Sequence, residues 1–282
     1  MPRDIKELIA EVEKHGFAIG SPIAVTGATS ELFGNLQPVD PSQSLLHYLP
    51  LHRFASLISG AAIYLRRLDL FQDQFEGKLP AANDSEVSDF TAQFMGQFGM
   101  TEKDVNNWKA FLTGTNRKLT YVHCWFASDS EDVSMWRDYA DSGNGVCVRT
   151  TARRLGEAIS RPSQLGLELR RVTYTGEQEA LPEIISCLPA GRKQARPEFI
   201  RECEVRIIGT ITEKAWAAGF TTPDREPPDH QLISVNFERL FERVYVGPNA
   251  PDTTFQEVEA LANDAAGCRV VHRSNLSPFP LS

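Results

Sequence analysis

The segment FIRECEVRII, residues 199–208, places two carboxylates and a guanidinium at alternate positions. Read as a β-strand over 199–209, it projects Glu202, Glu204 and Arg206 from one face, because successive side chains of a strand point to opposite sides. The carboxylates would repel each other at about 7 Å Cα spacing, and the arginine would offset that repulsion. A glutamate on a rigid strand can grip a ligand hydroxyl or stabilise a developing cation. The alternative is an ordinary half-exposed strand with a wet outer face.

A second group of candidate residues lies in MWRDYADSGNGVCV, residues 135–148. Trp136 and Tyr139 are three residues apart, so one helical turn would bring both rings to one face. Such a pair can stack on a flat ring such as nicotinamide, adenine or another base. The glycines of the GNG turn would let the backbone approach another group closely. The alternative is that both rings fill the core where a helix meets the sheet.

Basic and aromatic residues also occur together in LLHYLPLHR, residues 45–53. His47 and Tyr48 would point to opposite faces of a strand. Arg53 falls in the loop or helix start that follows, where it could meet a phosphate. A single histidine on a strand is more often structural than catalytic, so this segment alone does not define a site.

The loop FQDQFEG, residues 71–77, adds Asp73 and Glu76, unless it is an ordinary surface turn. With Glu202 and Glu204, these carboxylates could hold magnesium for phosphodiester cleavage if the fold brought them together. The six histidines are scattered and do not have the spacing of metal ligands. No catalytic transition metal is therefore expected. The chain also lacks a P-loop, a Rossmann glycine motif, an HExxH motif and a GxSxG nucleophile elbow.

The bulk composition is that of an ordinary soluble protein of 282 residues, with 41% hydrophobic and 23% charged residues. The formal net charge of -8 argues against a general nucleic-acid coat. The five cysteines form no CxxC motif and are odd in number, as expected for thiols in a reducing compartment. The N-terminus does not resemble a signal peptide, and no apolar run approaches the length of a membrane span. We therefore expect a cytoplasmic protein with no membrane partner.

Hydrophobic periodicity predicts an N-terminal helical or cap segment over 1–40 and a single α+β domain over 41–282. The elements do not alternate strictly, so one mixed sheet of about seven strands with flanking helices is favoured over a doubly wound parallel sheet. Strands are expected at 44–50, 63–68, 119–128, 145–151, 168–174, 199–209, 241–248 and 268–274. Helices are expected at 4–15, 53–62, 83–116, 134–140, 153–159 and 253–267.

Four segments together resemble a widespread bacterial protein family of unassigned function. They are IYLRRLDLFQDQFEG, VHCWFAS, MWRDYADSGNGVCV and RECEVRII. The family's pattern is an F-x-D-x-x-E loop, a cysteine-containing strand, an MWxxYA…GvCi block and an ExExR strand, and the late VYVGPNA also fits. The resemblance covers about residues 45–274. This chain has Gln72 where members usually have asparagine, and His47-Tyr48 where an aromatic-arginine pair is usual.

The ExE of the late strand is also similar to the ExE of ADP-ribosyltransferases, including mono-ADP-ribosylating toxins. This second resemblance implies a compact mixed β core with NAD as substrate. It implies that Glu204 is the catalytic glutamate that holds the nicotinamide-ribose hydroxyl, and that Glu202 orients the acceptor. His47 would be the early-strand contact to NAD, with Arg53 as a substitute.

Departure of nicotinamide builds an oxocarbenium-like cation, which a fixed carboxylate and aromatic faces would stabilise and shield. In this picture Trp136 or Tyr139 stacks on nicotinamide. The full set of residues expected to contact NAD is His47, Tyr48, Arg53, Trp136, Tyr139 and Arg206.

Three functions are compatible with these patterns. The first is an NAD-consuming enzyme, a transferase or glycohydrolase, acting as a toxin or antiphage-defence effector on a protein or nucleic-acid acceptor. The second is a non-catalytic regulatory module that binds a nucleotide or a partner segment. The third is a metal-dependent phosphodiesterase or nuclease. The first is favoured because the glutamate pair, the aromatic pair and the basic residues fall in separate segments, as a composite cleft requires.

Overall fold

The computed structural model describes residues 39–73, 76, 116–176, 189–211, 226–266 and 270–280. The predicted helices at 4–15 and 83–116 lie outside these residues, apart from residue 116, so they stay predictions. The same holds for the segment 1–40, of which only the last two residues are described.

The described strands are β1 (Ser44–Leu49), β2 (Ala62–Arg67), β3 (Thr120–Ala127), β4 (Val146–Thr151), β5 (Leu165–Arg171), β6 (Thr173–Thr175), β7 (Arg192–Gln194), β8 (Glu204–Ile211), β9 (His230–Ser234), β10 (Arg243–Val246) and β11 (Val271–Arg273). The helices are α3 (Leu51–Gly60), α6 (Asn116–Lys118), α7 (Val133–Tyr139), α8 (Ala152–Ala158), α9 (Pro197–Ile200), α11 (Phe237–Leu240) and α12 (Asp252–Ala266), with 3-10 turns η1 (Leu68–Leu70), η4 (Asp141–Gly143) and η6 (Pro189–Gly191).

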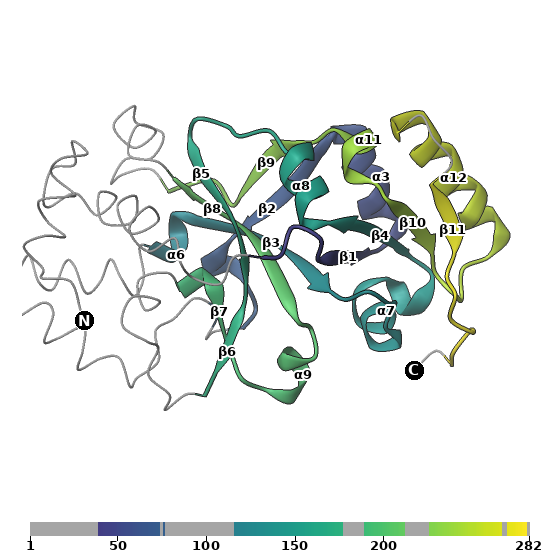
Figure 1. The fold of residues 1–282 in the computed structure, drawn as a ribbon, viewed down its shortest axis with the longest axis horizontal. Helices are drawn as coiled ribbons and strands as arrows, with labels where there is room; N and C mark the ends of the chain where they lie inside the picture. Colours follow the sequence, from purple (N-terminus) through teal and green to yellow (C-terminus); the bar gives the residue numbers. More distant parts are fainter. Residues whose placement is uncertain are drawn as a thin grey trace, which may run out of the picture.

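Nine of the strands form one mixed sheet, which confirms the predicted α+β class (Figure 1). Its order is β11-β10-β4-β1-β3-β2-β9, and β8 pairs with both β3 and β5. Within this sheet β10 and β11 pair in parallel, and the other pairs are antiparallel. Strands β6 and β7 form a separate parallel pair.

Helices cover the two faces of the sheet unequally. Apolar residues of α3, α8, α11 and α12 pack on one face in a large buried cluster that includes Phe54, Leu155 and Val258. Helix α7 packs on the other face through Met135 and Trp136, in a smaller cluster. None of the helices in the described part of the chain is long and apolar enough to cross a membrane.

Two strands, β1 and β2, pair with the same edge of β3. Its other edge pairs with β8 over residues 120–126. On the shared edge, β1 pairs only with residues 126–127, and β2 pairs only with residues 121–122. Between them, at residues 123–125, neither neighbour continues the ladder. We call this opening between β1 and β2 the fork.

Strand β9 was not predicted, because its pattern of burial runs against its hydrophobicity. Gln231 is buried while the neighbouring Leu232 is exposed. Strand β9 pairs with β2 along its whole length, from Ser234 opposite Ala62 to His230 opposite Arg66. The pairing with β2 thus overrides the side-chain preference that sequence patterns measure.

The glycine turn after α7 lies against two other segments of the chain. Gly143 has a φ of +86°, and a Cβ on Gly145 would lie 2.4 Å from the carbonyl oxygen of Leu49. A Cβ on Gly247 would lie 2.1 Å from the carbonyl oxygen of Gly143. The Gly247 amide donates a hydrogen bond to the Gly145 carbonyl at 3.0 Å. The close approach predicted for the GNG turn is therefore to the chain itself.

Adding a methyl group at this crossing is expected to destabilise the fold. Gly247→Ala should lower the free energy of unfolding by about 1–3 kcal/mol, because backbone must move to accommodate the Cβ. Gly156→Ala is the matched control, since its Cβ would meet nothing within 4 Å in α8. That change should raise the free energy of unfolding by up to about 1 kcal/mol, through helix propensity. Urea unfolding measures both, and equal stabilities of the two variants would contradict the packing account.

Candidate functional site

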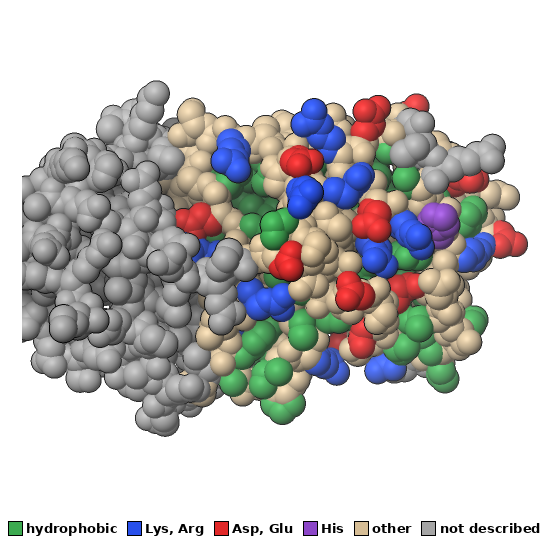
Figure 2. All heavy atoms as spheres, in the orientation of Figure 1, with side chains coloured by type: hydrophobic (Ala, Val, Ile, Leu, Met, Phe, Trp, Pro, Cys, Tyr) green, Lys and Arg blue, Asp and Glu red, His purple; other side chains and the backbone are tan. Residues whose placement is uncertain are grey.

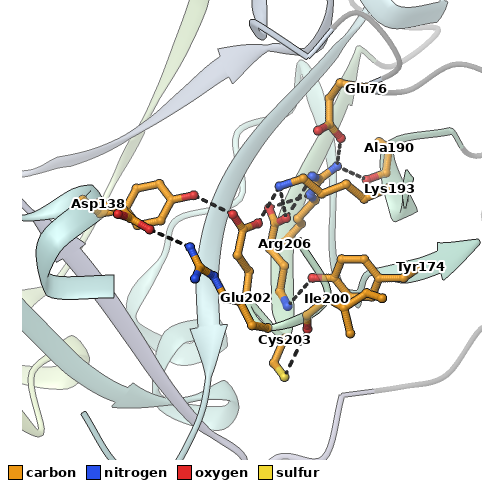
Figure 3. A network of polar contacts seen from close by, with 12 residues as sticks. Glu76, Asp138, Tyr174, Ala190, Lys193, Ile200, Glu202, Cys203 and Arg206 are labelled. Atoms are coloured by element: carbon orange, nitrogen blue, oxygen red, sulfur yellow. Dashed lines mark hydrogen bonds and ion pairs between the residues drawn. The ribbon is translucent and has the colours of Figure 1, made fainter. Parts of the chain in front are cut away.

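A fully buried arginine organises a network of charges on the face of the sheet that α7 covers (Figure 3). Arg206 binds Glu204 with two hydrogen bonds, Nε to Oε1 at 2.8 Å and Nη2 to Oε2 at 3.1 Å. Its Nη1 donates to Glu76 Oε1 at 2.6 Å and to the Ala190 carbonyl at 2.8 Å. The alternative that this face of β8 is wet is therefore wrong, because Glu204 and Arg206 are both buried.

Lys193, on β7, links the two glutamates of the ExE motif. Its Nζ lies 2.5 Å from Glu202 Oε2 and 3.4 Å from Glu204 Oε2. The other oxygen of Glu202 accepts a hydrogen bond from the hydroxyl of Tyr139 at 2.6 Å. Lys193 Nζ also lies 4.2 Å from the ring centroid of Phe199, a cation–π contact. The lysine thus relieves the repulsion between the two carboxylates, a role that the sequence had predicted for Arg206 alone.

Glu202 does not lie on a strand, contrary to the prediction of a strand from residue 199. Helix α9 (Pro197–Ile200) occupies the start of that segment, and residues 201–202 form a turn. Cys203 then has a φ of 40°, in the left-handed region that non-glycine residues seldom adopt. The amide of Glu204 donates to the hydroxyl of Tyr174 at 2.9 Å as β8 begins. The turn, rather than strand alternation, brings Glu202 beside Glu204.

The network holds its groups in fixed charge states. Burial opposes the charge of Glu204, but Arg206 and Lys193 outweigh it and lower the pKa of the carboxyl to about 2. Burial also opposes the charge of Lys193, yet Glu204 and Glu202 raise the pKa of its ammonium. Burial and the nearby Glu202 raise the pKa of Tyr139, so its hydroxyl stays protonated and donates. Glu204 is therefore held in its ionised form, which suits an electrostatic role rather than proton transfer.

The network forms one wall of a cavity of about 240 Å³. The rest of the lining is largely aromatic and apolar, and most of it comes from β1, β3 and α7. The volume is far more than the 10–15 Å³ or so that one water requires. The lining residues are Leu46, His47, Tyr48, Phe71, Cys124, Trp125, Phe126, Met135, Tyr139, Lys193, Glu202, Glu204 and Arg206.

Two histidines close the fork beside this cavity. Nδ1 of His47 lies 3.1 Å from the Cys124 carbonyl, and Nδ1 of His123 lies 3.1 Å from the Tyr64 carbonyl. A carbonyl only accepts, so each ring carries its proton on Nδ1. The two ring centroids are 4.4 Å apart, and His47 is 5.2 Å from Trp125. Imidazole donors thus replace the ladder hydrogen bonds that β1 and β2 do not make.

Six of the eight residues predicted from the sequence line the cavity: His47, Tyr48, Tyr139, Glu202, Glu204 and Arg206. The other two do not. Trp136 is fully buried, donates its indole N–H to Glu131 and packs against Tyr48 with ring centroids 5.0 Å apart. Arg53 is exposed on α3. Trp136 therefore fills the core, as the alternative for this residue stated. It does not present its ring to the cavity beside Tyr139.

Two residues of the site, Lys193 and Cys124, were not singled out in the sequence analysis. Lys193 comes from a three-residue strand, too short to show a period. Cys124 lies opposite Arg206 on β3, and burial together with Glu204 raises the pKa of its thiol. Glu76 was noted only as a metal ligand, although it binds Arg206 instead. The cysteine could have been found from strand alternation alone, once β3 was paired with β8.

Three of the four carboxylates named in the phosphodiesterase alternative are bound by cationic side chains. Glu76, Glu202 and Glu204 each accept a hydrogen bond from an arginine or lysine. In the described part of the chain, no group of three histidine, cysteine, aspartate or glutamate side chains is arranged to hold a metal ion.

Across the face drawn in Figure 2, lysine and arginine side chains lie interspersed with aspartate and glutamate. The described part of that face carries no broad patch of one sign. Such a surface does not offer the continuous basic stripe that tracks a nucleic-acid backbone.

Comparison of the chain with protein-family models, with curated proteins and with solved structures finds no match.

Loss of the central guanidinium is expected to cost far more than loss of an exposed one. Arg206→Met leaves Glu204 and Glu76 buried without their partner, so the free energy of unfolding should fall by about 3–5 kcal/mol. Arg201→Met is the matched control, because Arg201 pairs with Asp138 at 2.8 Å with exposed fractions of 52% and 39%. It should cost about 1 kcal/mol or less. Denaturant unfolding that gave similar losses for both would contradict the assignment of the buried network.

The histidines of the fork should make the fold sensitive to mild acid. Burial lowers the pKa of His123 from 6.5 to about 4, and burial together with His123 lowers that of His47. The unfolded chain therefore takes up these protons first, and stability should fall as the pH drops from about 6.5 to 4. For His123 alone, the loss is on the order of 3 kcal/mol.

His123→Gln keeps an N–H donor for the Tyr64 carbonyl but cannot take up this proton. Its free energy of unfolding should therefore vary less with pH over that interval, as followed by urea unfolding at several pH values. An unchanged slope would show that the ring is not the titrating group.

Proposed function

We propose that the cavity is the active site of an NAD-consuming enzyme. The observation that carries the proposal is a buried carboxylate, Glu204, held by Arg206 and Lys193 in a cavity whose remaining lining is largely aromatic and apolar. The reaction would break the bond between nicotinamide and ribose, with the bonding electrons leaving on the nicotinamide nitrogen. The ribose carbon then gains cationic character, which a preorganised carboxylate stabilises.

The other cavity residues have distinct roles in this proposal. Glu202, with Tyr139 and Lys193 as partners, lies beside Glu204 and would orient the acceptor, which is water, a protein or a nucleic acid. Tyr139 takes the stacking role, because Trp136 is sealed in the core. His47 would contact the substrate as a neutral ring, since burial lowers its pKa well below the usual value.

A specific observation favours a second candidate, a non-catalytic module that binds a nucleotide or partner segment. Both oxygens of Glu204 already accept hydrogen bonds, from Arg206 and from Lys193. A carboxylate used in this way has less capacity left for a substrate hydroxyl. Binding of NAD without turnover would favour this second function. Membership of the bacterial family, and a role as toxin or defence effector, stay hypotheses beside either function.

The test is release of nicotinamide from NAD by the purified chain, measured chromatographically. Glu204→Gln should reduce the rate by about 10²–10³-fold, the usual cost of losing one preorganised electrostatic group. Glu202→Gln should impair transfer while it preserves the pair between Glu204 and Arg206. Glu257→Gln, on the exposed face of α12, is the matched control and should retain the full rate.

Thermal unfolding of each variant separates loss of chemistry from loss of fold. If the wild type releases no nicotinamide and NAD does not shift its melting temperature, the proposed function is wrong.

A further inference from the structure

The buried network contains more carboxylates than cations. Arg206 binds Glu76 and Glu204, and Lys193 binds Glu202 and Glu204. Three carboxylates therefore share two cations. The groups that raise the pKa of Lys193 against burial are the same three glutamates. Among the described residues, these three carboxylates carry one negative charge more than their two cations.

The uncompensated charge faces the cavity. Glu76 is sealed, with 1% of its side chain exposed, and does not line the cavity. Glu202 and Glu204 both line it. The series of ion pairs ends at Glu202 on the cavity side. In the described part of the protein, Lys193 is the only cationic partner of Glu202 (Figure 3). A ligand in the cavity thus lies beside more carboxylates than these two cations neutralise.

The cavity has room for one ring, and its described lining offers no cation that could bind phosphate. A cavity of about 150 Å³ accepts benzene, so 240 Å³ is enough for a single substituted ring. The rings of Tyr48, Phe126 and Tyr139 line it and favour a cation over their faces. Both cations in the lining, Lys193 and Arg206, already bind two carboxylates each.

We infer that the cavity selects a ligand group that is a single ring with one positive charge, such as an N-alkylated pyridinium, and that phosphate groups stay outside it. This inference rests on the proposed function for the identity of the ring, and it deepens that function by assigning the nicotinamide end of NAD to the cavity. It also predicts recognition of the cationic ring without any nucleotide attached.

The experiment compares two probes that differ by one charge, 1-methylnicotinamide, which is a cation, and nicotinamide, which is neutral. Calorimetric titration of the full chain should show about tenfold tighter binding of the cation. Glu202→Gln removes the excess negative charge and should bring the two affinities close together. Lys193→Met doubles the excess negative charge and should widen the difference in affinity between the two probes. Glu257→Gln, outside the cavity, should behave as the wild type.

Each other outcome overturns the inference. Equal affinities of the wild type for the two probes, or no binding of either at millimolar concentrations, would show that the cavity does not select a cationic ring. A preference that Glu202→Gln leaves unchanged would place its origin elsewhere. Because nicotinamide release from NAD is measured separately, turnover without cation preference would refute this inference alone. Cation preference without turnover would refute only the proposed enzyme.

Discussion

The bidentate pair between Arg206 and Glu204 is the interaction on which the candidate site depends. Burying these charges is costly, and the cost is offset only when every partner is in place. The guanidinium therefore joins β8, which carries both Arg206 and Glu204, to two other segments, through Glu76 and through the Ala190 carbonyl of η6. Because Arg206 is fully buried, it has no water to bind in place of these partners, and the network is held in one arrangement.

Much of the fold could be predicted from local pattern. Strands such as β3 and β4 are rich in β-branched and aromatic residues, and their positions agree with the expected ranges. The failures occur where tertiary contacts override local preference. Strand β9 buries Gln231 and exposes Leu232, and α9 replaces the first residues of the strand expected from 199. The fork could not be predicted, because no local pattern shows that two strands share one edge of a third.

The site was predictable to the extent that it follows strand alternation. Glu204 and Arg206 share a face as the period of two requires. His47 and Tyr48 both line the cavity, although alternation points them to opposite faces of β1. Lys193 could not be predicted, because only the folding of the backbone brings it beside Glu202 and Glu204. Trp136 was misassigned because α7 buries one ring and turns Tyr139 outward, which depends on how the helix sits on the sheet.

The fork has a geometric consequence for the two strands that form it. Helix α3 (Leu51–Gly60) connects β1 to β2, the two strands that share an edge of β3, yet none of its residues lines the cavity. A helix advances about 1.5 Å per residue, so the length of α3 spaces the end of β1 from the start of β2. One turn fewer would draw these strand ends about 5 Å closer and would shift the pairing of β1 or β2 along β3. A helix that does not line the cavity thus sets where β1 and β2 meet their shared neighbour.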